Sequence, residues 1–224
     1  MIFNQTVVAL VPMKEHSERV PGKNMRLFAG RPLFYHILDT LEKTYAVDEI
    51  VVDTDSEKIA AEASANFSKV RVLDRPEELR GDFVSMNEII AYDISQVPAD
   101  IYIQTHATNP LLRSETIVEG LRRFIQSEEH DSLFSVNRLQ TRLYTATGDP
   151  INHDPENLIR TQDLSPVFEE NSALYIFVQD SFAVHHRRIG GRPLMFETDR
   201  IESIDIDNEY TFRLAEMLAG YARR

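Results

Sequence analysis

The feature of this sequence that most constrains its fold is a regular alternation of short apolar runs with longer amphipathic segments. Residues 6–11 form a continuous apolar run of the kind found in buried strands. Pro32 then precedes apolar residues at helical spacing, which predicts an amphipathic helix over 33–45. Further strands are expected at 49–52, 70–73, 100–104, 132–136 and 173–178, with helices at 57–65, 85–94, 114–126 and 181–188 and a last helix that begins at 208–209.

This alternation predicts an α/β fold, a Rossmann-like and mostly parallel sheet with helices on both faces. The length suits one domain with a sizeable core, so we expect a single domain over residues 1–224. Periodicity weakens within 137–170, which we interpret as an insertion or an excursion that serves dimerisation or substrate binding. Ligands bind beyond the carboxyl ends of the strands in such sheets, so polar segments at those ends are the candidate sites.

Composition disfavours several other classes of protein. The net charge of −12 argues against general affinity for nucleic acid or anionic membranes. The chain has no cysteine, which excludes disulfides and thiol nucleophiles. It has no run of about twenty apolar residues, and no basic segment precedes the first apolar run. We therefore expect a cytoplasmic protein with no membrane span and no cleaved signal.

Two segments depart from the average charge. Residues 13–31 carry five basic and two acidic side chains, whereas 197–209 carry six acidic side chains and one arginine. A polyanion suits the first segment and a metal ion the second. Solvated surface loops are the alternative for both.

The basic segment follows the first predicted strand and contains Pro21-Gly22. Such a loop can present backbone N–H groups and cations to a triphosphate. The Walker pattern G-x-x-x-x-G-K-[ST] is absent. The dinucleotide pattern G-x-G-x-x-G is absent as well, which disfavours an oxidoreductase of that type.

In the acidic segment Asp205 and Asp207 alternate with Ile204 and Ile206. If the segment is a strand, the two carboxylates share one face. Neighbouring carboxylates repel unless a cation joins them, and oxygen ligands without nearby His or Cys suit Mg²⁺. The alternative is a solvent-facing pair before the last helix.

The basic segment carries Ser17, Arg19, Pro21, Gly22, Lys23 and Asn24 in the spacing of the signature P-A-R-x-x-S-K-R-x-P-G-K-N. In this it resembles the acylneuraminate cytidylyltransferase family, the CMP-N-acetylneuraminic acid synthetases, and further segments match that family in the same order. Further landmarks are G-R-P-L at 30–33, V-V-D-T-D-S at 51–56, R-P-E-E-L at 75–79, A-T-N-P-L-L-R at 107–113, N-S-A-L-Y at 171–175 and S-I-D-I-D at 203–207. Together they cover nearly the whole chain.

The resemblance implies the fold of nucleotide-diphospho-sugar transferases and a homodimer. It implies transfer of CMP from CTP to the anomeric hydroxyl of a nonulosonic, sialic-type sugar acid, with release of pyrophosphate. The implied catalytic residues are Lys14, Arg19, Lys23 and Asp207, and the implied Mg²⁺ ligands are Asp205 and Asp207. The implied nucleotide-binding residues are Lys14, Ser17, Arg19, Lys23, Asn24, Arg75, Asp82, Ser85 and His106. At the acceptor sugar the resemblance implies Gln104, Arg142, Arg160 and Asn171.

The expected reaction needs no covalent intermediate, because the anomeric hydroxyl can attack the α-phosphate in line. Catalysis then depends on positioning and charge neutralisation. The general base stays open between a metal-bound water, a carboxylate and the substrate itself.

Departures from the family pattern leave alternatives open. Lys14 and Glu18 stand where the family has an arginine and a lysine, and His106 stands where it has a glutamine. The family's R-P-N-G is E-E-N-S around Asn171, which leaves a modified nonulosonate (legionaminate, pseudaminate or an amino-sugar acid) as an alternative acceptor to N-acetylneuraminate. A CMP-Kdo synthetase, another NTP-sugar nucleotidyltransferase and a non-catalytic nucleotide- or sugar-binding protein are the alternatives. Residues 185–188 resemble the exposed end of a helix, and we assign them no role.

Overall fold

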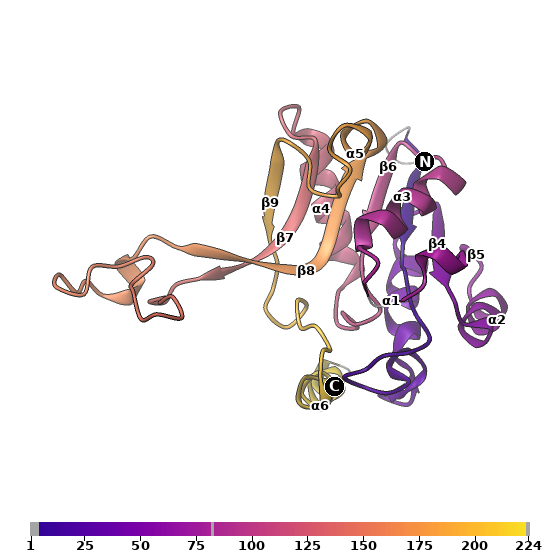
Figure 1. Ribbon diagram of the computed structural model, residues 1–224, viewed down its shortest axis with the longest axis horizontal. Helices are drawn as coiled ribbons and strands as arrows, with labels where there is room; N and C mark the ends of the chain where they lie inside the picture. The colour runs from indigo at the N-terminus through magenta and orange to yellow at the C-terminus, as the bar shows by residue number, and fades with distance from the viewer. Residues whose placement is uncertain (1–4, 82, 223–224) are drawn as a thin grey trace.

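The body of the molecule is a seven-stranded sheet in the order β5-β4-β1-β6-β8-β7-β9 (Figure 1). The computed structural model describes residues 5–81 and 83–222. Neighbouring strands run parallel except at β8, which is antiparallel to β6 and to β7. The prediction of a mostly parallel α/β sheet is confirmed.

The elements follow the predicted alternation. The strands of the sheet are β1 (Val7–Leu10), β4 (Glu49–Thr54), β5 (Val70–Asp74), β6 (Ile101–Gln104), β7 (Ser132–Leu139), β8 (Val167–Val178) and β9 (Pro193–Glu197). The helices are α1 (Leu33–Lys43), α2 (Glu57–Asn66), α3 (Met86–Gln96), α4 (Ser114–Gln126), α5 (Gln179–His185) and α6 (Glu209–Ala222). A small ribbon, β2 (Leu27–Phe28) with β3 (Arg31–Pro32), and the short helices η1 (Lys23–Met25), η2 (Glu77–Leu79) and η3 (Thr161–Asp163) lie in the connections.

Helices cover both faces of the sheet, which explains why its central strands are apolar throughout. Val7 and Ala9 of β1 pack in one core with α1, α2 and α4. Val8 and Leu10 pack on the opposite face with α3 and α5. Since successive side chains of a strand point to opposite faces, both sets of residues must be apolar.

Three segments differ from what the sequence pattern indicated. Residues 193–197 form β9, an edge strand that the sequence pattern did not indicate. The predicted helix over 181–188 ends at His185, because His186 adopts a left-handed conformation with φ 53°. Residues 203–207, whose alternation would suit a strand, form an irregular segment without a strand partner.

Beyond the sheet, β7 and β8 continue as a long two-stranded arm that protrudes from the body (Figure 1). Their pairing shifts between Phe134 and Val136, and this irregularity separates the part in the sheet from the arm. The loop-rich tip between Leu139 and Val167 carries exposed apolar side chains, among them Tyr144 and Leu158. The excursion expected within 137–170 is therefore a projecting arm.

A third, smaller core joins the segment after β1 to the C-terminal helix α6. It packs Val20, Phe28 and Leu33 against Ile206 and Phe212. This core places α6 beside the basic loop, as Figure 1 also shows for the lower end of the molecule. The basic and acidic segments identified in the sequence thus lie side by side.

No helix in the described part of the chain combines the length and apolarity that crossing a membrane requires.

Candidate nucleotide-binding site

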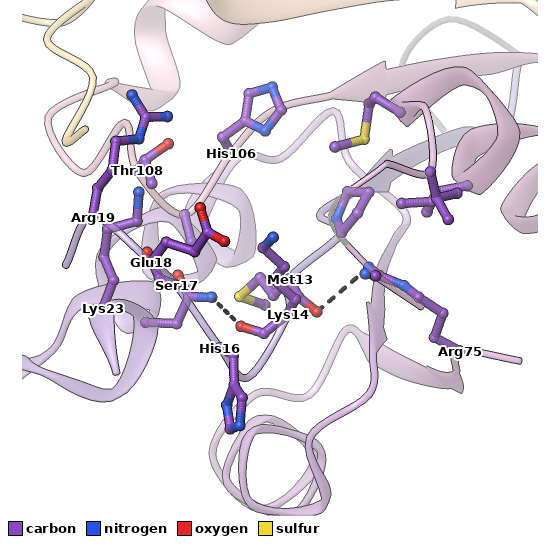
Figure 2. A pocket seen from close by; sticks show the side chains of 17 residues that line it. Met13, Lys14, His16, Ser17, Glu18, Arg19, Lys23, Arg75, His106 and Thr108 are labelled. Atoms are coloured by element: carbon purple, nitrogen blue, oxygen red, sulfur yellow. Dashed lines mark hydrogen bonds between the residues drawn. The ribbon is translucent and has the colours of Figure 1, made fainter. Parts of the chain in front are cut away.

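A pocket of about 370 Å³ opens where β1 and β6 end, on the side of the sheet where ligands were expected. Its volume is typical of small-molecule sites. Seven of the predicted nucleotide-binding residues line it: Lys14, Ser17, Arg19, Lys23, Asn24, Arg75 and His106. Figure 2 shows Arg19 and Lys23 at one end of the pocket beside Thr108, with Arg75 at the other end.

The basic loop is held in shape by its own polar contacts. The backbone N–H of Met13 donates to the Asp53 carbonyl over 2.8 Å, so the chain continues along β4 after β1 ends. The side-chain amide of Asn24 donates to the Lys14 carbonyl over 2.9 Å and closes the loop. Gly22 turns the chain with φ 62°, a conformation that favours glycine.

Arg75 is held by a buried carboxyl pair beneath the pocket. Its Nε lies 2.5 Å from Asp53 Oδ1, and its Nη2 donates to the Met13 carbonyl over 3.4 Å (Figure 2). Asp93 of α3 is fully buried beside Asp53. Burial, followed by the hydrogen bond to Asp53, raises the pKa of Asp93 to about 9. Asp93 is therefore protonated at neutral pH, which removes the repulsion between two buried carboxylates.

The acidic segment is anchored on the loop after β6 rather than in the sheet. The Ile206 N–H donates to the Thr108 carbonyl over 2.9 Å, and the Asn109 amide donates to the Ile204 carbonyl over 3.3 Å. Asn208 caps α6 through the Thr211 N–H over 3.0 Å. Ile206 is fully buried, so the apolar positions still enter the core without a ladder of strand hydrogen bonds.

The basic loop and the acidic segment meet directly. Lys23 Nζ donates to the Ile206 carbonyl over 2.7 Å, between the two aspartates in sequence. Arg19 Nη2 lies 2.8 Å from Asp207 Oδ1. Burial lowers the pKa of Lys23, although Asp205 and Asp207 oppose this shift. Burial also raises the pKa of Asp205, with a further contribution from the charge of Asp207.

Asp205 and Asp207 lie beside Arg19 and Lys23 but do not line the pocket itself, and their oxygens fit a magnesium ion. Asp205 Oδ1 is buried and has no hydrogen-bond partner among the described residues, and the Asp207 carboxylate acts on it electrostatically. Residues 5–81 and 83–222 contain no cluster of three or more His, Cys, Asp or Glu side chains that would hold a metal. An ion here must take further ligands from water and phosphate, which is the mode of binding that Mg²⁺ favours.

His106 lines the pocket as a neutral side chain. Burial, with smaller effects from Arg188 and Lys23, lowers its pKa to about 3. Gln104 Nε2 lies 3.1 Å from His106 Nε2. His106 therefore offers a phosphate or sugar a hydrogen bond and no positive charge at neutral pH.

Ser85, which was expected near the nucleotide, does not line the pocket. Ser85 caps α3 in a reciprocal pair of hydrogen bonds with Glu88, and its neighbours Val84 and Met86 line the pocket in its place. Asp82 lies outside the described residues.

Glu18 also lines the pocket, so a negatively charged side chain lies in the wall of the space where a triphosphate would bind (Figure 2).

The four residues expected at the acceptor do not line the pocket of this chain. Gln104 is fully buried, and its amide donates to the Thr105 carbonyl over 3.0 Å. The Asn171 amide donates to Asn137 and Thr198, which ties the base of the arm together. The remaining two lie at the tip of the arm, where each bonds to a neighbour in the tip: Arg142 to the Ile159 carbonyl and Arg160 to Asp163.

The sequence did not indicate one residue that lies next to the pocket. Arg188 was interpreted as part of an exposed helix end, yet its guanidinium lies 3.8 Å above the Tyr175 ring and donates to Gln104 Oε1 over 2.6 Å. The turn at His186 redirects the chain toward the sheet. Nothing in the sequence around 185–188 signals this turn.

Fold and pocket together define a nucleotidyltransferase-like α/β protein. The chain belongs to the cytidylyltransferase family, whose model matches residues 8–219. It is 28% identical over 230 residues to a CMP-N,N'-diacetyllegionaminic acid synthase of Legionella pneumophila, with 95% of each chain covered. It is 26% identical over 217 residues to N-acylneuraminate cytidylyltransferase A of Danio rerio, which covers 94% of this chain and 50% of that protein. The chain thus spans about half the length of the latter relative.

One further relative and one solved structure are similar to this chain. A pseudaminic acid cytidylyltransferase of Campylobacter jejuni is 23% identical over 222 residues, covering 94% of this chain and 95% of that protein. Among solved structures, a CMP:2-keto-3-deoxy-manno-octonic acid synthetase complexed with CTP has a TM-score of 0.71 at 16% identity, covering 97% of this chain and 99% of that one. At that identity the structural match supports the fold alone.

Proposed function

We propose that this protein transfers CMP from CTP to the anomeric hydroxyl of a nonulosonic sugar acid and releases pyrophosphate. The observation that carries the proposal is the contact between the basic loop and the acidic segment at one end of the pocket, through Lys23 with Ile206 and Arg19 with Asp207. Membership of the cytidylyltransferase family supports CTP as the nucleotide.

In the proposed reaction the chain neutralises the triphosphate and orients it for in-line attack. Lys14, Arg19 and Lys23 line the pocket and would stabilise charge on the triphosphate and on the leaving pyrophosphate. Asp205 and Asp207 would hold Mg²⁺, which supplies charge neutralisation at the phosphates. Arg19 is ion-paired with Asp207 in this structure. Its guanidinium is therefore already positioned between the acidic segment and the pocket.

The acceptor class follows from the relatives, whose names include N-acylneuraminate, legionaminic acid and pseudaminic acid enzymes. All of these sugars are nonulosonic acids, so we propose an acceptor of this class. A CMP-Kdo synthetase is the second candidate, because a solved enzyme of that type shares the fold.

We propose a homodimer that forms through the arm. Tyr144, Ile151 and Leu158 expose more than half of their surface at its tip, an arrangement that favours burial against another chain. In such a dimer Arg142 and Arg160 would serve the partner's pocket, which reconciles their predicted role with their distance from the pocket of their own chain.

We also propose a cytoplasmic location, because the reaction needs a supply of CTP.

Incubation of the protein with CTP, Mg²⁺ and a panel of sugar acids tests the proposal. The panel comprises N-acetylneuraminate, legionaminate, pseudaminate and Kdo, and mass spectrometry detects the CMP-sugar. We expect product with a nonulosonic acid and with CTP in preference to ATP, GTP or UTP. Thermal stabilisation by CTP without any pyrophosphate release would identify a non-catalytic binding protein.

A further inference from the structure

Arg188 is a half-buried cation whose described partners are neutral. Its Nη1 donates to Gln104 Oε1 over 2.6 Å, its Nη2 donates to the Tyr175 hydroxyl over 3.2 Å, and its guanidinium stacks 3.8 Å over the Tyr175 ring. No carboxylate of the described residues forms an ion pair with it. Glu170 is linked to the Arg188 guanidinium only through the Tyr175 hydroxyl, which donates a hydrogen bond to Glu170.

Such an arrangement is unfavourable unless an anion completes it. Removing a guanidinium from water costs free energy that neutral hydrogen-bond acceptors repay only in part. Burial accordingly lowers the pKa of Arg188, although Tyr175 and Glu170 oppose the shift. A guanidinium still keeps its charge at neutral pH, and further N–H donors of Arg188 remain beyond the two already used.

The place of Arg188 connects it to the nucleotide pocket. Gln104 ends β6, Tyr175 is its partner on β8, and the Gln104 amide also contacts the His106 ring. His106 lines the pocket, and the charge of Arg188 contributes to the lowered pKa of its imidazole. Arg188 therefore lies one side chain away from the space proposed for CTP.

The backbone holds this side chain in position. The Arg188 N–H contacts Asn87 Oδ1 of α3 over 3.4 Å, and the Gly190 N–H donates to the Ser132 hydroxyl over 2.8 Å. Asp131 then accepts the N–H groups of Gly191 and Arg192. Arg187, one residue earlier, is exposed. A guanidinium fixed by its own backbone loses less entropy when it binds a ligand.

We propose that Arg188 binds the carboxylate of the acceptor sugar acid and so selects an acidic acceptor. This inference rests on the proposed function and assigns a specificity-determining residue to it. A planar guanidinium matches a carboxylate with two parallel hydrogen bonds. Among the other cations, Arg142 and Arg160 bond within the tip of the arm and would reach a pocket only in a partner chain, whereas Arg200 is exposed and donates to the Arg138 carbonyl.

The inference is tested by assaying variants of the protein against two forms of the acceptor, one with and one without the carboxylate. Wild type, Arg188→Gln and the control Arg187→Gln are assayed with the best acceptor of the panel and with its C1 carboxamide. We expect Arg188→Gln to lower kcat/KM for the acid about 100-fold, chiefly through KM for the sugar, and to lower it less than about threefold for the carboxamide. KM for CTP should change less than about twofold, and Arg187→Gln should match wild type.

Arg188→Lys should recover part of the loss for the acid, because it restores the charge without the planar fork. Equal losses for acid and carboxamide would overturn the inference and make Arg188 a support for Gln104 and Tyr175. Calorimetric titration of N-acetylneuraminate separates this failure from that of the proposed function. If no acid yields a CMP-sugar, weaker binding by Arg188→Gln than by wild type would still support the inference. Equal binding, or none to the wild type, would overturn it.

Discussion

The triphosphate end of the pocket and the region of Arg188 beside the pocket are built in different ways. At one end, Lys23 and Arg19 already contact the acidic segment, so oppositely charged groups balance each other before any ligand binds. At the other side, beyond His106, Arg188 rests on neutral partners and its charge has no carboxylate partner among the described residues. The balanced end suits a magnesium–triphosphate complex, which brings both signs of charge. The unbalanced side suits an anion alone.

Asp207→Ala should have the largest effect, because it removes a proposed metal ligand at the balanced end. We expect pyrophosphate release to fall at least about 1000-fold while the melting temperature stays within a few degrees, since Asp207 is partly exposed. Asp180→Ala, at an exposed position of α5, is the control. Wild-type turnover of Asp207→Ala at saturating Mg²⁺ would refute the metal assignment.

Lys23→Gln should follow, because it removes the cation that contacts the acidic segment from the loop side. A loss of roughly 100-fold in kcat/KM for CTP is expected, in line with the removal of one group that stabilises developing phosphate charge. Lys43→Gln, at the end of α1, is the control and should leave kinetics unchanged. If KM for the sugar changes and the kinetics with CTP do not, Lys23 belongs to the acceptor side and the comparison fails.

The carboxyl pair under Arg75 should appear in the pH dependence of stability. Burial raises the pKa of Asp93 in the folded protein to about 9, above its value in the unfolded chain. The folded state therefore binds the extra proton, and this stabilising contribution declines as pH rises toward 9 and then levels off. The slope is at most about 1.4 kcal/mol per pH unit.

Urea denaturation of wild type and Asp93→Asn at pH 6, 7.5, 9 and 10 measures this effect. Wild type should lose free energy of unfolding relative to Asp93→Asn as pH rises to about 9, and the difference between the two proteins should stay constant above it. A difference that does not vary with pH would show that Asp93 does not carry the proton.

Glu18→Gln should have the smallest effect and the opposite sign. Removing a negative charge from the pocket wall should lower KM for CTP about threefold, because Glu18 is exposed and solvent screens its repulsion. Glu15→Gln is the control, since Glu15 does not line this pocket. A raised KM for CTP would instead assign Glu18 a favourable contact, such as an orienting bond to Lys14 or Ser17.

Much of the balanced end could be predicted from the sequence, because its residues are local. Ser17, Arg19, Lys23 and Asn24 lie within one loop, and the end of a buried strand determines where that loop emerges. The acidic pair was found through an alternation typical of a strand, yet residues 203–207 form no strand. Bonds from Ile206 to Thr108 and from Asn109 to Ile204 hold this segment, together with the small core around Phe212.

The acceptor side could not be predicted in the same way. Arg188 reaches Gln104 and Tyr175 only because His186 turns the chain and β8 runs antiparallel beside β6. Both depend on contacts between residues that are far apart in sequence, and no local pattern encodes them. The arm could be predicted only in part. Its weak periodicity indicated an excursion, but it did not indicate that Arg142 and Arg160 would lie away from the pocket.

Calorimetric titration of CTP into wild type, Asp205→Asn and Asp207→Asn, with and without Mg²⁺, tests most directly whether the loop and the acidic segment share one magnesium–nucleotide complex. We expect Mg²⁺ to tighten CTP binding by wild type at least about tenfold and to have little effect on either variant. An equal effect of Mg²⁺ on all three proteins would place the ion, and with it the reacting phosphates, elsewhere.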